Sequence, residues 1–311
     1  MQRLLWKIQA VALILLFLSS LAIAASDEPH SVSSENVQQK KFSVQVNVDL
    51  VTTDVTVFGK PDSQLRADDF IVYDNDVAQR VSHFSLDLLP VAAALVVDSS
   101  APVYQSLAKA ALQTMKAKDR VVLFSFDKHP MRLSGLTEDR DLIRGKISEM
   151  KVRRGSNILD TIYDAGQYLK KNAGNRRRAV ILISDACIDR CGLKGDARVE
   201  FLASGTAFYY IRVARSVSIR LYDCVESDEI LKKYADDTGG EVLNARAEES
   251  FRSDFDNLMS NLRLQYTLGF NPSDPGKAGS WHKLMVRLAA PDHCPACRLK
   301  SRSGYYSSSS Q

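Results

Sequence analysis

The stretch Val91-Ala-Ala-Ala-Leu-Val-Val97 consists entirely of apolar residues. A strand that is covered by helices on both faces shows such an unbroken run, because neither face meets water. Residues 121–126, 179–183 and 207–213 have nearly the same character. The segments between these runs carry apolar residues at helical spacing. This alternation predicts an α/β fold with βαβ units in a doubly wound, mostly parallel sheet.

We expect helices between these strands, and β structure before and after this α/β segment. The periodicity predicts helices over 103–118, 139–150, 158–169, 196–204, 229–235 and 248–262, with a short strand from residue 242. The regions before and after this α/β segment show the alternation of half-buried strands and the turn residues of β structure.

The two flanking regions together predict one small β-sandwich. Apolar residues alternate with polar ones from Phe42 to Leu50, and residues 42–86 continue as β. After the last helix, residues 265–270, 281–288 and 297–306 are expected strands. Residues 42–86 are too few to form an independent domain. We therefore expect strands of the two flanks to pair, with the α/β domain inserted between them.

The N-terminus has the pattern of a secretory signal. Arg3 and Lys7 precede an apolar stretch over residues 8–23, and Ala22-Ile23-Ala24 offers small residues for cleavage. The alternative is an uncleaved membrane anchor, since a stretch of this length can span a bilayer. Residues 25–41 are polar and predict a linker. We therefore expect an exported protein, periplasmic or extracellular.

The net charge bears on the class of partner, and the cysteine content bears on the disulfide bonds. The formal net charge is +4 over 311 residues, which gives no indication of nucleic-acid binding. In an oxidising compartment the five cysteines tend to pair. Their spacing suggests the pairs Cys187–Cys191 and Cys294–Cys297, which leaves Cys224 free; Cys191–Cys224 is the alternative for the first pair.

Polar side chains follow the buried runs at the points where the strands end. Asp98 and Ser100 come after the first run, Ser156 precedes the helix that starts at residue 158, and Asp185 follows the third run. In open α/β sheets, ligands lie beyond the carboxyl ends of the strands. Carboxylates and hydroxyls are the oxygen ligands that Mg²⁺, Mn²⁺ or Ca²⁺ accept. These four residues are therefore the candidate metal ligands.

This arrangement resembles the von Willebrand factor type A family. That family has an adhesion site written D-x-S-x-S with a distant Thr and a distant Asp. The resemblance places the Asp on Asp98, the first Ser on Ser100, the Thr position on Ser156 and the late Asp on Asp185. The second Ser falls on Pro102, which has no hydroxyl. The resemblance implies a degenerate metal site for Mg²⁺, Mn²⁺ or Ca²⁺. The alternative is a metal-free loop in which Asp98 caps the following helix.

Further short matches resemble the von Willebrand factor A-related proteins described in Acidobacteria. They lie at residues 65–73, 136–140, 238–240, 265–270 and 302–306. The resemblance implies an exported, non-catalytic protein that binds a protein partner, one that presents an acidic side chain to the metal. The expected organisation is a signal peptide (1–24), linker (25–41), β segment (42–89), von Willebrand factor A-like domain (90–263), β segment (264–306) and tail (307–311).

Two other functions compete with this interpretation. Cys294-Pro-Ala-Cys297 resembles the C-x-x-C of thiol oxidoreductases, but it lies between expected strands, where a structural disulfide is the simpler interpretation. A purely structural envelope component is the other alternative. The sequence has no G-x-S-x-G, no G-x-G-x-x-G and no phosphate loop, so it offers no support for a hydrolase, a nucleotide or a small-molecule substrate.

Overall fold

A computed structural model describes residues 50–59, 64–153, 155–185, 195–213, 221–245 and 248–307. The expected signal peptide, linker, almost all of the strand predicted from residue 42, and the pair Cys187–Cys191 lie outside the described residues. The side chain of Cys224 is also outside them. None of the described helices has the length and apolar character that crossing a bilayer requires.

The central sheet has six strands in the order β10-β9-β8-β5-β6-β7. All neighbouring pairs are parallel except β6 and β7. The strands are β5 (Val91–Asp98), β6 (Arg120–Phe126), β7 (Pro130–Arg132), β8 (Arg177–Ser184), β9 (Ala207–Val213) and β10 (Val242–Ala245). The predicted α/β fold with a mostly parallel sheet is therefore confirmed.

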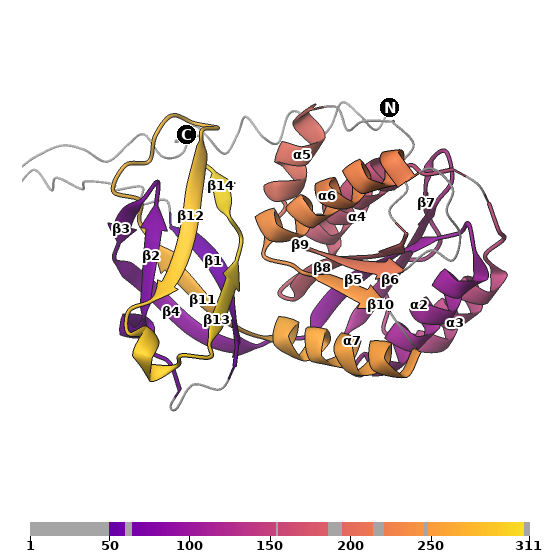
Figure 1. Cartoon of the computed structure of the whole chain (residues 1–311), viewed down its shortest axis with the longest axis horizontal. Coiled ribbons are helices and arrows are strands. Elements are labelled where there is room, and N and C mark those ends of the chain that lie inside the picture. The colour runs from indigo at the N-terminus through magenta and orange to yellow at the C-terminus, as the bar shows by residue number, and fades with distance from the viewer. Residues whose placement is uncertain are drawn as a thin grey trace, which may run out of the picture. The chain divides into compact units, whose positions relative to one another are not determined.

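Helices cover both faces of this sheet (Figure 1). One face packs against α2 (Pro102–Thr114), α3 (Arg140–Glu149) and α7 (Glu248–Arg263), and the other against α4 (Ile158–Asn172), α5 (Gly195–Leu202) and α6 (Leu221–Thr238). Along β5, Ala93 and Leu95 belong to the first core, whereas Ala92 and Ala94 belong to the second. The unbroken apolar run follows from this double coverage.

The flanking regions pair with each other in two antiparallel four-stranded sheets, β13-β1-β11-β4 and β14-β12-β2-β3. In the first, Val51 of β1 lies opposite Phe270 of β11. Val55, Val72 and Leu284 belong to one shared core. The predicted β-sandwich of N-terminal and C-terminal strands is therefore confirmed. Its strands are β1 (Val51–Phe58), β2 (Phe70–Asp74), β3 (Val77–Gln79), β4 (Val81–Leu88), β11 (Leu264–Phe270), β12 (Trp281–Leu288), β13 (Arg298–Ser301) and β14 (Gly304–Tyr306).

Several element boundaries differ from the sequence prediction. Helix α2 ends at Thr114 rather than at residue 118, because a turn follows in which Lys116 N donates to Asp119 Oδ2 over 2.9 Å. Helix α6 begins at Leu221, eight residues before the predicted start. Its first turns mix polar and apolar residues without clear periodicity. The single strand expected over 297–306 is two strands, β13 and β14.

Candidate functional site

Asp98 is the centre of a hydrogen-bonded cluster at the carboxyl edge of the central sheet. It is the last residue of β5, and the carboxyl group is 5% exposed. Its Oδ1 accepts a hydrogen bond from Ser100 N over 2.8 Å, and its Oδ2 accepts one from the Ser184 hydroxyl over 2.7 Å. Ser184 ends β8, the strand beside β5. The two strand ends are therefore joined through one carboxylate.

Tyr104 extends this cluster to Asp185. Tyr104 lies in the first turns of α2 and is 5% exposed, and its hydroxyl is close enough to Asp185 and Asp98 for both charges to act on it. Ser100 itself is exposed, and Asp185 is half-buried. The structure thus brings together three of the four predicted ligands, Asp98, Ser100 and Asp185, with Tyr104 among them.

The electrostatics of this cluster are unfavourable for a second negative charge. Burial raises the pKa of the Asp98 carboxyl, hydrogen bonds from Ser100 and Ser184 oppose that rise, and the charge of Asp185 adds to it. The pKa of the Tyr104 hydroxyl is also raised, first by burial and then by the charges of Asp185 and Asp98. Among the described residues, no Lys, Arg or His forms an ion pair with Asp98.

Ser156, the fourth predicted ligand, lies on the adjacent loop and takes no part in these hydrogen bonds. Arg153 N donates to Ser99 O over 3.1 Å, and Asn157 N donates to Asp127 O over 3.0 Å, so both ends of this loop are held at the ends of β5 and β6. Gly155 adopts a φ of +143°, and a Cβ there would lie 2.4 Å from the Asp127 carbonyl carbon. Only glycine permits this close approach.

Asp98 does not cap helix α2, which argues against that version of the metal-free alternative. The N-cap residue of α2 is Ala101, no side chain caps the helix, and Pro102 occupies its first turn. Proline suits this position because its missing N–H would have no partner in the helix. Asp98 instead closes a local turn onto Ser100 N. The neighbouring Ser99 hydroxyl donates to Phe126 O over 3.0 Å and so binds β6.

The sequence analysis missed Asp127, a third carboxylate at this edge. It directly follows β6, just as Asp98 ends β5, so the same rule of strand ends could have identified it. Its Oδ1 accepts from His129 N over 3.0 Å, and Oδ2 lies 3.1 Å from Arg153 Nη1. The His129 and Arg153 hydrogen bonds lower the pKa of Asp127. Arg153 therefore already compensates this charge, unlike that of Asp98.

The cluster fits a hard divalent cation in charge and in donor type. Asp98 and Asp185 are adjacent carboxylates, and the hydroxyls around them are oxygen donors of the kind that Mg²⁺ accepts. The fit is incomplete, because Pro102 removes one hydroxyl that the resemblance predicts. Within the described part of the chain, no group of three or more His, Cys, Asp or Glu side chains is arranged for a metal.

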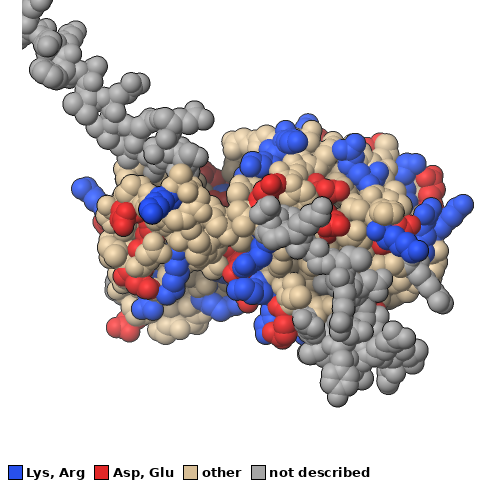
Figure 2. Space-filling model, turned by 90° about the horizontal axis from the view of Figure 1, so that it is seen from above, with Lys and Arg blue, Asp and Glu red and all other residues tan. Residues whose placement is uncertain are grey.

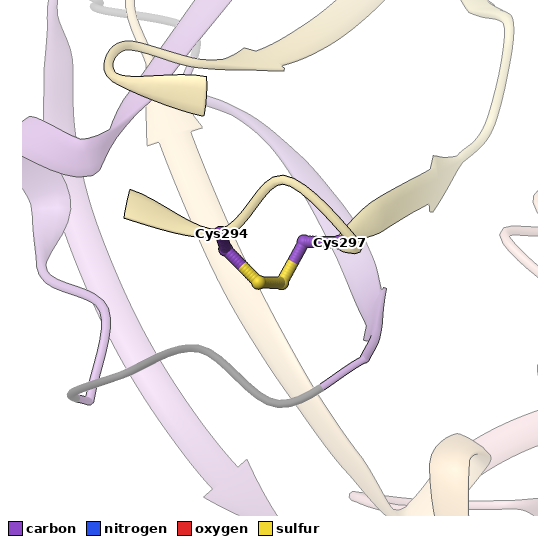
Figure 3. The surroundings of a disulfide bond; sticks show 2 residues. All are labelled: Cys294 and Cys297. Atoms are coloured by element: carbon purple, nitrogen blue, oxygen red, sulfur yellow. A yellow bond between two sulfur atoms is a disulfide. The ribbon is translucent and has the colours of Figure 1, made fainter. Parts of the chain in front are cut away.

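The C-x-x-C segment forms a cross-link within a turn between strands. Cys294 and Cys297 form a disulfide in the turn that leads into β13 (Figure 3). Cys297 N donates to Cys294 O over 2.9 Å, and Cys294 is 5% exposed. Thiol oxidoreductases instead place the reactive cysteine accessibly at a helix N-terminus. This geometry supports the structural interpretation of the pair.

The face of the molecule seen in Figure 2 shows no single large patch of one charge. On the face seen in Figure 2, Lys and Arg side chains alternate with Asp and Glu. Two exposed apolar side chains accompany the candidate site: Val103 at the start of α2 is 47% exposed, and Val152 on the loop of Ser156 is 59% exposed. Recognition at this edge would therefore combine local polar groups with these two valines.

Comparison with known families and structures identifies the same region. Residues 94–187 match the von Willebrand factor type A domain. No curated protein matches the chain.

Three solved structures are among those that match. BatB from Bacteroides thetaiotaomicron has 14% identity and a TM-score of 0.44, covering 56% of this chain and 98% of its own. A von Willebrand factor type A protein from Catenulispora acidiphila has 11% identity and a TM-score of 0.44, covering 83% and 73%. The vWF domain of the type V pili tip protein Mfa5 from Porphyromonas gingivalis has 13% identity and a TM-score of 0.43, covering 56% and 95%.

Proposed function

Because the α/β domain of this chain is a von Willebrand factor type A domain, we propose that the protein is an exported, non-catalytic binding protein that captures a protein partner at the carboxyl edge of its central sheet. The observation that carries the proposal is the juxtaposition of Asp98, Ser100 and Asp185, which come from the ends of two neighbouring strands. The proposal of export rests on the N-terminal sequence.

A weakly held divalent cation is part of this proposal. Asp98, Ser100, Ser156 and Asp185 would hold it, with Mg²⁺ as the first choice and Mn²⁺ or Ca²⁺ as alternatives. A bound cation supplies an open coordination position that an acidic side chain of the partner can fill. Such a contact joins two proteins strongly, because it is charge-assisted. The uncompensated charge of Asp98 beside Asp185 supports this role.

The exposed valines supply the second part of the binding surface. Val103 and Val152 lie on the two segments that the hydrogen bond from Arg153 N to Ser99 O holds together. Apolar side chains at the centre of a polar rim are typical of protein interfaces. The edge therefore offers a polar centre for an acidic side chain and apolar contacts beside it.

Site-specific photo-crosslinking in the cells that express the chain tests this function. A photoreactive side chain replaces Val103, which is exposed next to the site, or Lys171, which is exposed near the far end of α4. We expect protein adducts from position 103, fewer of them when Asp185→Asn is added, and few from position 171. Equal adducts from both positions, or a yield that Asp185→Asn leaves unchanged, would contradict the proposed surface.

A further inference from the structure

A polar cavity of about 320 Å³ lies at the opposite end of strand β8 from the candidate site. Arg177 begins β8 and lines this cavity, whereas Ser184 ends the strand and contacts Asp98. The lining includes residues of β1, the start of β8, the turn before β9, the segment between β13 and β14, and the helices α4 and α6. The cavity thus combines residues of the α/β domain and the β-sandwich.

Positive charge exceeds negative charge in the lining. The ionisable residues there are Lys170, Arg177, Arg178 and Arg302 on one side and Asp54 and Asp237 on the other. Asp237 already forms ion pairs with Arg198 and Lys233, which do not line the cavity. Asp54 pairs with Arg177. Among the described residues, the remaining cationic side chains form no ion pair with a carboxylate of the lining.

Several guanidinium donors in the lining have no partner. Arg177 is only 7% exposed; its terminal nitrogens donate to Thr267 Oγ1 and Gln265 O, but its Nε has no hydrogen-bond partner. Arg302 donates from Nη2 to Thr52 O over 2.6 Å, and its Nε is likewise unpartnered. Among the described residues, Arg178 forms neither an ion pair nor a hydrogen bond through its side chain.

Three cationic side chains of the lining remain available to a ligand. Lys170, Arg178 and Arg302 line the cavity, and within the described part of the chain none of them forms an ion pair. A bound anion would supply the counter-charge that these side chains lack.

The titration behaviour of the arginines agrees with a missing anion. Burial lowers the pKa of the Arg178 guanidinium, and only the charge of Asp54 opposes the shift. Burial also lowers the pKa of Arg302, and the charges of Asp54 and Tyr305 oppose this decrease. A buried cation without sufficient counter-charge costs free energy, and a bound anion removes that cost.

We propose that this cavity binds a phosphate group, either inorganic phosphate or the phosphate of a small organic molecule. Arginine forks bind phosphate oxygens through two parallel hydrogen bonds, and Lys170 adds a further positive charge to the lining. A volume of about 320 Å³ is at the small end of ligand-binding cavities and leaves room for a short organic group beside the phosphate. The bound anion joins the α/β domain to the β-sandwich.

Calorimetric titration of the full chain tests the site, with inorganic phosphate, glycerol phosphate and acetate as probes at matched ionic strength. We expect both phosphates to bind and acetate to bind at least about tenfold more weakly, since a carboxylate offers fewer acceptors. If both phosphates fail to bind, or if acetate binds as tightly as phosphate, the assignment is wrong. The better of the two phosphates identifies the source of the group.

Two variants locate the binding. Arg178→Gln is expected to weaken phosphate binding about tenfold or more, through the loss of a charged donor. Arg144→Gln makes the same charge change on the exposed surface of α3, outside the cavity, and should leave binding unchanged. Equal losses in Arg178→Gln and Arg144→Gln would overturn the proposal.

Discussion

The hydroxyl of Ser184 donates a hydrogen bond to Asp98 Oδ2 over 2.7 Å, and so joins the last residues of two adjacent parallel strands. Ser184 is fully buried and Asp98 nearly so. This contact holds one carboxylate below the surface of the carboxyl edge, while Ser100 remains exposed beside it. Asp98 is therefore held at a strand end, whereas Ser100, Ser156 and Asp185 lie on the loops beside it.

Replacement of Asp98 by Asn should not destabilise the fold at neutral pH. The folded-state pKa of Asp98 is raised above its unfolded value, chiefly by burial, so the folded state holds more protons between the two values. The stability of the wild type therefore falls as pH rises through that interval. An Asn side chain can still accept from Ser100 N and donate to Ser184. Urea denaturation should give Asp98→Asn an equal or higher free energy of unfolding at pH 7, and an advantage that shrinks in acid.

Asp127→Asn is the matched control, and its expected effect on the free energy of unfolding is opposite to that of Asp98→Asn. Hydrogen bonds from His129 N and Arg153 lower the folded-state pKa of Asp127. Its contribution to stability is therefore present above the unfolded pKa of about 3.9 and is lost as pH falls through the folded value. Asp127→Asn should be less stable than the wild type at pH 7, with a difference that shrinks in acid. If both variants shifted in the same direction, the electrostatic account of this edge would fail.

Pro102→Ser should strengthen cation binding. It supplies a hydroxyl at the position where the resemblance predicts one, on the first turn of α2. We expect the Mg²⁺ affinity to rise about three- to tenfold, because each added oxygen ligand replaces a water. Isothermal titration calorimetry measures this change, and Val103→Ser, one residue further along the helix, is the control. If the hydroxyl at position 102 left the Mg²⁺ affinity unchanged, the cation would not bind beside the start of α2.

Gly155→Ala should disturb the loop that carries Ser156. The φ of +143° strains any other residue, and the new Cβ would lie 2.4 Å from the Asp127 backbone. We expect a loss of about 1–3 kcal/mol in the free energy of unfolding and weaker Mg²⁺ binding. Gly135→Ala, with nothing within 4 Å of the added carbon, is the control and should stay within about 0.5 kcal/mol of the wild type. Similar stability losses in both would exclude the close approach as the cause.

The buried pair Asp119–Arg263 anchors the end of α7. The Asp119 side chain is 0% exposed and that of Arg263 4% exposed, and Val91 N also donates to Asp119. Arg263→Ala leaves a buried carboxylate without its counter-charge, so we expect a loss of about 3–5 kcal/mol in chemical denaturation. The exposed pair Arg144–Asp141 is the control, where Arg144→Ala should cost at most about 1 kcal/mol. A loss of similar size in both variants would contradict this role of burial.

The architecture was predictable because its signals are strong and local. The run at residues 91–97 is apolar on both faces, and double coverage by helices is its physical cause. The β pattern on both sides of the α/β segment predicted that strands of the two flanks pair, although it did not identify β1 and β11 as partners. The start of α6 was not predictable in this way, because its first turns lack a clear apolar stripe.

The candidate site was predictable only in part. Strand ends gave Asp98, Ser100 and Asp185, which the structure brings together. Tyr104 was missed, because a tyrosine in an amphipathic helix gives no sign that its hydroxyl lies near two carboxylates. Asp127 was missed although it follows a buried run. The position of Ser156 depends on the backbone of Gly155 and on contacts with residues 127–128, which no local pattern reveals.

Calorimetric titration of the wild type and of Asp185→Asn with Mg²⁺ tests most directly whether Asp98, Ser100, Ser156 and Asp185 form a cation site. The account predicts wild-type binding with a dissociation constant of about 10⁻⁴–10⁻³ M, the range of weak extracellular cation sites. It predicts a loss of at least about tenfold in Asp185→Asn, with the unfolding temperature little changed. An absence of heat with Mg²⁺, Mn²⁺ and Ca²⁺ alike, or equal affinity in both proteins, would contradict it.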